Sequence, residues 1–144
     1  MKKLILITMV AIMTGPIPSC KNNSDDTSVG PIPTGAYQYK SYDTTGVAIV
    51  KGWLTLNYED SLHITGEWHL EKIGNPQNIG PQVGSGNLIG GIDQGRVWVE
   101  LNPQYADNNL QLIGIIEDGY YEGEWIWLSI VGITNRGSFE AVRI

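Results

Sequence analysis

Two histidines and a glutamate in one stretch, His63, Glu67 and His69, are the residues best suited to bind a metal ion. Every second side chain of an extended strand points to the same face, so these three share a face. At a rise of about 3.3 Å per residue, His63 and His69 lie about 20 Å apart, and one metal ion could contact only Glu67 and His69. The spacing favours solvated polar positions on a sheet surface, and we expect no metal and no cofactor.

The acidic residues Glu122 and Glu124 alternate toward one face, beside a turn that holds Glu117 and Asp118. Paired carboxylates are what glycoside hydrolysis requires, and serine chemistry requires a base and an orienting carboxylate. Neither histidine lies in a strained turn near a serine, so the sequence does not predict a serine-based site. The acidic residues are better explained as a solvated acidic hairpin. We therefore expect a protein that is not an enzyme.

The glycine-rich run 84–90 has a superficial likeness to a phosphate-binding loop. Such a loop needs a fixed glycine spacing, a following Lys and Ser or Thr, and a helix whose N-terminus faces the phosphate. This run has none of them and does not predict nucleotide binding. It is better explained as the mouth of a long loop, residues 73–85.

The only cysteine, Cys20, follows a segment with the layout of a secretory signal. Lys2 and Lys3 form a basic start and residues 4–13 are an apolar run. Pro16 helps to end this run before it reaches the length of about 20 residues that spans a membrane. The layout predicts a signal peptide over residues 1–19.

The segment that ends in Ser19-Cys20 resembles the lipobox of bacterial lipoproteins, and Ser24-Asp25-Asp26 resembles the acidic export signal of Bacteroidota surface lipoproteins. The resemblance implies lipidation at Cys20, with palmitate among the acyl groups. It also implies an outer-membrane lipoprotein, on the periplasmic face or at the cell surface. The polar, Pro- and Gly-containing residues 20–34 are predicted to form a disordered tether.

Charge limits the partners of the chain. Its 144 residues include 9 basic and 15 acidic ones, a net charge of −6; loss of Lys2 and Lys3 with the signal would leave 7 basic residues and −8. An acidic surface does not favour nucleic acid, and it offers no basic patch to a membrane. Membrane attachment is then expected through the lipid anchor alone, and acylation of Cys20 would leave the domain no thiol.

Residues 35–144 are predicted to form one all-β domain, because they alternate in short runs and show no helical period. Short turns rich in Asp and Gly join most runs and predict an antiparallel up-and-down meander. About eight strands of this length favour a closed or nearly closed small barrel, with a two-sheet sandwich as the alternative. The predicted strands are Ala36–Tyr42, Val47–Tyr58, Leu62–Lys72, Gly86–Ile92, Arg96–Asn102, Asn109–Glu117, Tyr120–Leu128 and Gly137–Arg143.

The same alternation assigns side chains to the two faces of the sheet. The predicted inward residues are Leu62, Ile64, Gly66, Trp68, Leu70, Val97, Val99, Leu101, Tyr121, Gly123, Trp125, Trp127, Phe139 and Ala141. The predicted outward residues are His63, Thr65, Glu67, His69, Glu71, Arg96, Trp98, Glu100, Glu122, Glu124, Ser138 and Glu140. Trp53 is not placed, because Leu54, Leu56 and Tyr58 compete with it for the core.

A weak internal repeat supports barrel closure, since Gly66-Glu67-Trp68 recurs as Gly123-Glu124-Trp125. Glycines at equivalent strand positions are what a small barrel requires where its strands bend. The pattern resembles the calycin-like barrels, lipocalins and avidins among them, over residues 46–142. The resemblance implies an architecture and carries no set of binding residues over to this chain.

The first of two functional interpretations is a binding module for a small amphipathic or glycan ligand. Its site would lie at an open barrel end, between loops 73–85 and 103–108. The first loop would either act as a mobile lid or be no more than a long surface connection. The candidate lining residues are Trp68, Tyr121, Trp125 and Trp127. A packed aromatic core is the competing explanation for these four, because eight strands enclose little more room than side chains fill.

The second interpretation is a protein-interaction module, either an accessory subunit of an envelope complex or a hydrolase inhibitor. Exposed aromatic residues mark contact sites, and the candidates are Trp98 and Tyr105. An enclosed cavity that reaches Trp125 would favour the binding module. A filled core with an aromatic patch outside it would favour the interaction module.

Overall fold

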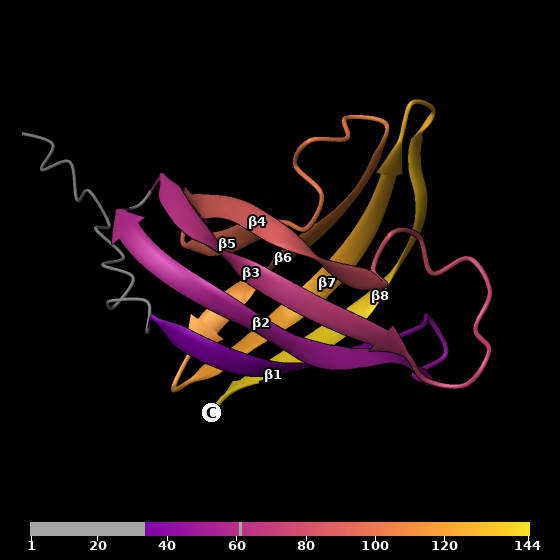
Figure 1. The fold of residues 1–144 in the computed structure, drawn as a ribbon, viewed down its shortest axis with the longest axis horizontal. Coiled ribbons are helices and arrows are strands. Elements are labelled where there is room, and N and C mark those ends of the chain that lie inside the picture. Colours follow the sequence, from indigo (N-terminus) through magenta and orange to yellow (C-terminus); the bar gives the residue numbers. More distant parts are fainter. Residues whose placement is uncertain (1–33, 61) are drawn as a thin grey trace, which may run out of the picture.

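The computed structural model describes residues 34–60 and 62–144, which run through eight β-strands (Figure 1). The predicted signal peptide, Cys20 and nearly all of the predicted tether lie outside the described residues. The strands are β1 (Gly35–Tyr42), β2 (Ala48–Asp60), β3 (His63–Lys72), β4 (Gly84–Asp93), β5 (Arg96–Glu100), β6 (Asn108–Glu117), β7 (Tyr120–Ser129) and β8 (Gly132–Arg143). Across these residues there is no helix of the length and apolarity that a membrane crossing needs.

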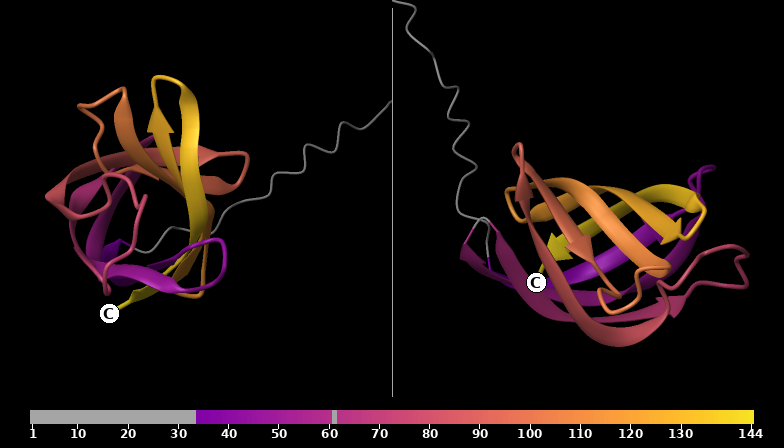
Figure 2. Two further views of the ribbon diagram at one scale, coloured as in Figure 1. Left: turned by 90° about the vertical axis from the view of Figure 1, so that its right-hand side faces the viewer. Right: turned by 90° about the horizontal axis from the view of Figure 1, so that it is seen from above.

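Each strand pairs antiparallel with the next, and β8 returns to pair with β1. The barrel closes between Tyr37 and Arg143 at one limit of this last pairing and between Tyr42 and Ser138 at the other. Figure 2 shows the resulting ring of strands end-on. The predicted meander and barrel are thereby confirmed, and the sandwich is excluded.

The two barrel ends differ in the length of their connections. The end at which β1 begins and β8 finishes has short turns, and Gln94, Gly95, Asp118 and Gly119 adopt positive φ there, as tight hairpin turns require. The opposite end, which we call the loop end, carries turn 43–47, loop 73–83, loop 101–107 and turn 130–131. The molecule therefore has one plain end and one end built from long connections.

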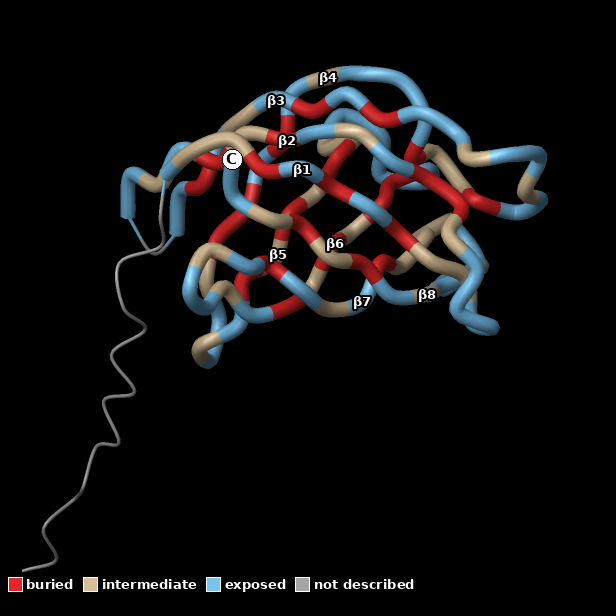
Figure 3. The backbone as a smooth tube through the Cα atoms, turned by 90° about the horizontal axis from the view of Figure 1, so that it is seen from below, coloured by how far each residue is buried: buried red, intermediate tan, exposed pale blue. Residues whose placement is uncertain are grey.

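Buried and exposed residues alternate along most of the sheet (Figure 3), and the inward apolar side chains fill the barrel. The second half of β7 and the start of β8 lack this alternation. The largest fully buried side chains include Trp125, Tyr37, Tyr39, Tyr121 and Leu54. The predicted faces agree with the structure except at Leu62, which is 71% exposed. Leu62 precedes the first residue of β3 and lies in a turn, so the alternation of that strand does not extend to it.

Glycines stand where neighbouring strands approach most closely. A Cβ atom built on Gly66 would lie 1.8 Å from the carbonyl oxygen of Thr55, and one on Gly114 would lie 1.9 Å from that of Glu122. Such distances exclude any side chain, so glycine permits the strand coiling that closes the barrel. The predicted role of the glycine repeat is supported by these contacts.

The β7–β8 hairpin is longer than predicted, because β8 begins at Gly132 rather than Gly137. Its first residues pair with β7 alone, and pairing with β1 starts only at Ser138. The two-stranded ribbon so formed projects at the loop end (Figure 1). Its tip carries Ile130 and Val131, which are 84% and 89% exposed.

Candidate binding surface on the barrel wall

The four aromatic residues predicted to line a ligand site lie inside the barrel and take part in its packing. Trp68, Tyr121 and Trp125 are buried, and Trp127 is partly buried against the core. The indole N–H of Trp68 donates to the Leu101 carbonyl (2.6 Å), and that of Trp125 donates to the Tyr42 carbonyl (2.8 Å). Buried N–H groups need such partners. These contacts describe structural side chains that are already satisfied.

Loop 73–83, the predicted lid, is folded against the loop end of the barrel, and we call it the plug. The buried side chain of Gln82 accepts from the Ser41 hydroxyl (2.9 Å) and donates to the Ile79 carbonyl (2.6 Å). Asn102 donates to the Pro81 carbonyl (2.9 Å), and Asn135 donates to that of Asn78 (2.7 Å). Loop 73–83 is thus tied to β1, to loop 101–107 and to β8, and it covers the end that was expected to be open.

Glycine 80 fixes how closely this plug approaches the core. A Cβ at Gly80 would lie 2.7 Å from the Trp127 ring, and Gly80 adopts a positive φ of 66°. Only glycine tolerates both conditions without strain. Trp127 in turn donates its indole N–H to the Asn108 side chain (3.0 Å) and packs against the core, so both its ring and its polar edge are used within the fold.

A groove of about 590 Å³ lies instead on the outer wall, across β8, β1, β2 and β3; we call it the wall groove. Strand register places two rows of outward side chains there, Val142–Gln38–Trp53–His69 and Glu140–Lys40–Lys51–Glu71. Tyr39 and Gly52, on the inward row between them, complete the lining together with Ile144. The wall groove therefore combines aromatic, apolar, amide and charged groups.

Trp53 and His69 form the aromatic part of the wall groove. Their rings stack across the β2–β3 pair with centroids 6.1 Å apart and an interplanar angle of 23°. Trp53 remains 40% exposed. An indole held by a neighbouring ring and open to solvent on the strand surface offers a flat apolar platform beside polar groups.

The wall groove holds charged groups of both signs, Lys40 and Lys51 beside Glu71 and Glu140. Lys40 lies 3.9 Å from Glu140, and the same carboxylate accepts a short hydrogen bond from the Tyr42 hydroxyl. This hydrogen bond raises the pKa of Tyr42. His69 Nε2 lies 3.5 Å from Glu71 Oε1. The groove is thus polar without a strong excess of one charge.

A second groove, of about 270 Å³, adjoins the first on the side of β4; we call it the side groove. It is lined by Trp53, Glu67, Trp68, Ser85, Gly86 and Asn87. Trp53 lines both grooves, so the two meet at one indole. This pair of connected hollows is the best candidate binding surface among the described residues.

Trp53 is the functional candidate that sequence reasoning missed. Leu54 and Leu56 are both fully buried, so strict alternation along β2 would have placed Trp53 outside. That signal was present in the sequence. The stacking partner and the hollows could not be recognised, because they depend on the register between strands.

The two predicted protein contacts differ in accessibility. Tyr105, in loop 101–107, is 55% exposed. Trp98 points outward as predicted, but its side chain is only partly accessible because it lies over Gly91, where a Cβ would approach the indole to 3.2 Å. Tyr105 remains available as a contact, and Trp98 is available over part of its surface.

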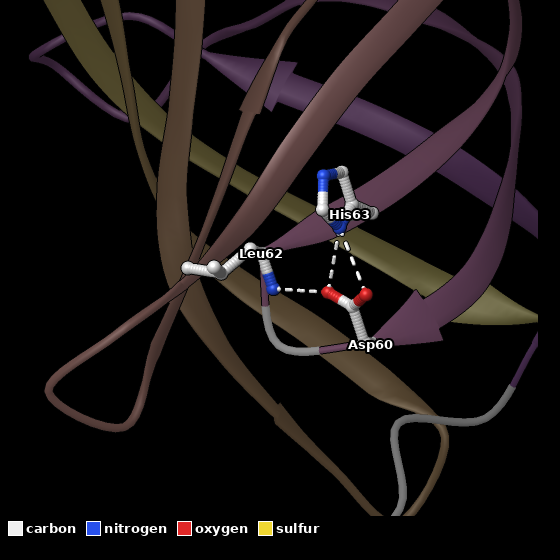
Figure 4. Close-up of polar contacts among 3 residues, drawn as sticks. All are labelled: Asp60, Leu62 and His63. Carbon is white, nitrogen blue, oxygen red and sulfur yellow. Dashed lines mark hydrogen bonds and ion pairs between the residues drawn. The ribbon is translucent and has the colours of Figure 1, made fainter.

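His63 and His69, at opposite ends of the histidine-containing stretch, have different partners. His63 contacts the Asp60 carboxylate through Nδ1 (2.8 Å), and the same carboxylate accepts from the Leu62 backbone N–H (2.8 Å; Figure 4). These hydrogen bonds lower the pKa of Asp60, and the bond to His63 has the largest effect. Asp60 therefore closes the β2–β3 turn. Within residues 34–60 and 62–144 no cluster of three or more His, Cys, Asp or Glu side chains could hold a metal ion.

Glu122 and Glu124 are exposed on the outer face of β7, as the sequence predicts for a solvated hairpin. Glu122 lies opposite Glu140 in the β7–β8 register, and both line a shallow hollow with Arg96. Glu140 is already engaged by Lys40 and Tyr42.

Comparison with protein-family models, curated proteins and solved structures gives no significant match to this chain.

Proposed function

We propose that the chain is an envelope lipoprotein whose barrel is a non-enzymatic binding module, and that it binds its ligand on the outer wall around Trp53. The observation that carries this proposal is the exposed Trp53–His69 stack at the junction of two grooves. An exposed aromatic platform with convergent polar groups is what a binding site requires.

A filled core by itself favours the interaction module, and the binding module is proposed first only because the outer wall offers a site of its own. That wall is a better site than the interior for two reasons. The aromatic residues inside the barrel are packed and hydrogen-bonded, and loop 73–83 is tied over the barrel end. A ligand inside would have to displace this core, whereas the wall groove is accessible in the folded protein. Of the two ligand classes expected, the glycan is favoured, because the wall groove is open and sets an exposed indole beside amide and charged side chains. An amphipathic molecule would bury its apolar part more fully in an enclosed cavity.

Ligand binding is tested by tryptophan fluorescence and thermal shift against a panel of envelope glycans and lipids. Trp53→Ala should abolish binding without loss of the fold, because the ring is on the surface. Tyr120→Ala is a matched control, since Tyr120 is also an exposed aromatic residue but lies beside the β6–β7 turn. A ligand that both variants bind equally well would overturn the proposed site.

The anchor is tested separately at Cys20. Cys20→Ser should abolish incorporation of a fatty-acid analogue and release the protein from membranes into the soluble fraction. Labelling that persists in the serine variant would show that the lipid is not attached at this residue.

A protein-interaction module is the second candidate, and the β7–β8 ribbon favours it. Ile130, Val131 and Ile133 are exposed at its tip, and Tyr105 is exposed on a loop at the same barrel end. Exposed apolar groups of this kind are typical of contact surfaces. A stoichiometric partner lost in an Ile130→Ser/Val131→Ser variant, but retained by Trp53→Ala, would support this candidate over the first.

A further inference from the structure

The wall groove and the side groove together describe an elongated binding surface rather than a single pocket. Trp53 lines both hollows, and the strand register places His69 and Ser85 on the same row as Trp53. Glu67 and Asn87 face each other on the next outward row, in the side groove. A ligand that fills both hollows must cross the Trp53 ring and run across β1, β2, β3 and β4.

The chemistry along this path suits linked sugar rings. A pyranose has one face of C–H groups that can lie on an indole, and hydroxyl groups at its edge that both donate and accept hydrogen bonds. The surface supplies the indole of Trp53 and, around it, the amides of Gln38 and Asn87 and the hydroxyl of Ser85. Apolar and polar groups alternate over short distances, as they do on a sugar.

The charges favour an uncharged ligand. The wall groove holds two lysines, Lys40 and Lys51, and two carboxylates, Glu71 and Glu140, so its charges balance. Glu67 adds a further acid in the side groove. The chain as a whole carries a net charge of −6. A polyanionic sugar chain would meet this field with little net positive charge to offset it.

We infer that the two grooves form subsites for a neutral oligosaccharide that crosses Trp53. This inference rests on the proposed function and specifies its ligand class. It makes Trp53 the shared platform and Asn87 a contact of the side groove only. Affinity should therefore rise with the number of sugar units, until the chain reaches from the wall groove into the side groove.

The test uses the full chain, with neutral glucose, mannose, galactose and N-acetylglucosamine oligomers of one to four units. Matching uronate oligomers serve as charged probes. For a neutral series that binds, calorimetry should show an affinity gain of about tenfold or more from one unit to the longer oligomers, with the uronate series weaker. Trp53→Ala should remove binding at every length, whereas Asn87→Ala should weaken only the longer oligomers.

Thermal unfolding and circular dichroism serve as controls for the folding of each variant. Trp53→Phe, which keeps a smaller aromatic platform, should retain part of the affinity. Equal affinity for one and four units, or tighter binding of the uronate series, would overturn the subsite inference and leave the Trp53 site standing. Absence of binding by every neutral oligomer would also overturn it. A ligand of any class whose binding survives Trp53→Ala would overturn the proposed function itself.

Discussion

The hydroxyl of Ser41 on β1 donates to Gln82 Oε1 in loop 73–83, 2.9 Å away and shielded from solvent inside the loop end of the barrel. The two residues are 41 positions apart, and neither side chain is exposed. A buried amide is stable only when its donor and acceptor are both used, and Gln82 also donates to Ile79. The contact makes the loop part of the folded barrel.

Ser41→Ala should therefore destabilise the protein by about 1–3 kcal/mol, because it leaves a buried amide oxygen without a donor. Amide hydrogen exchange should accelerate mainly in residues 73–83. Ser138→Ala, at an exposed position on β8, is the control and should fall within about 0.5 kcal/mol of the wild type. Unchanged exchange in the loop would contradict the proposed tie between Ser41 and Gln82.

Trp125→Ala should destabilise the barrel by about 3–5 kcal/mol, because the buried ring leaves a cavity and the Tyr42 carbonyl loses its donor. Glu124→Ala, one residue away on the outer face, should change the free energy of unfolding by no more than about 0.5 kcal/mol. Urea denaturation midpoints compare the two directly. A larger effect for Glu124→Ala would reverse the assignment of faces along β7.

The inward and outward faces were predictable from sequence, because a shift of the strand register by one residue would move all apolar side chains of that strand to the outer face. The strand order followed from short turns such as Asp118–Gly119, which join neighbours directly. The plug was not predictable, since Gln82 and Ser41 are brought together only by closure of the barrel. Residues 132–136 lie outside the predicted strands, yet their backbone pairs with β7 and extends the ribbon.

Gly66→Ala should be more damaging than its small size suggests. The added methyl group would meet the Thr55 carbonyl at 1.8 Å, so β2 and β3 would have to separate where the barrel bends. We expect a loss of at least about 3 kcal/mol in the free energy of unfolding. Gly46→Ala is the control, since it has open space around it and only the strain of a positive φ, about 1–2 kcal/mol. Similar urea midpoints for the two variants would show that the strands do not approach as closely as described.

Alkaline pH should destabilise the protein through its buried tyrosines, Tyr39 and Tyr121 foremost and Tyr37 in addition, since burial raises the pKa of all three. Burial raises the pKa of Tyr39 and of Tyr121 above the usual value of 10.0, while in the unfolded chain both phenols ionise near that value. The unfolded state therefore releases protons that the folded state retains. Stability should be constant with respect to these groups at lower pH and should fall above about pH 10, by about 1.4 kcal/mol per pH unit for each tyrosine.

Urea unfolding at a series of pH values measures this slope, and absorbance of the phenolate follows ionisation in the folded protein. Tyr39→Phe keeps the ring that stacks on Phe139 (centroids 5.8 Å apart) and removes one ionisable group. The loss of unfolding free energy per pH unit above about pH 10 should therefore be smaller by the contribution of one tyrosine. Ser138→Ala, which changes no ionisable group, should leave the slope intact. Ionisation of both Tyr39 and Tyr121 near pH 10 in the still-folded barrel would contradict their burial and, with it, the packed interior on which the proposal of an outer-wall site rests.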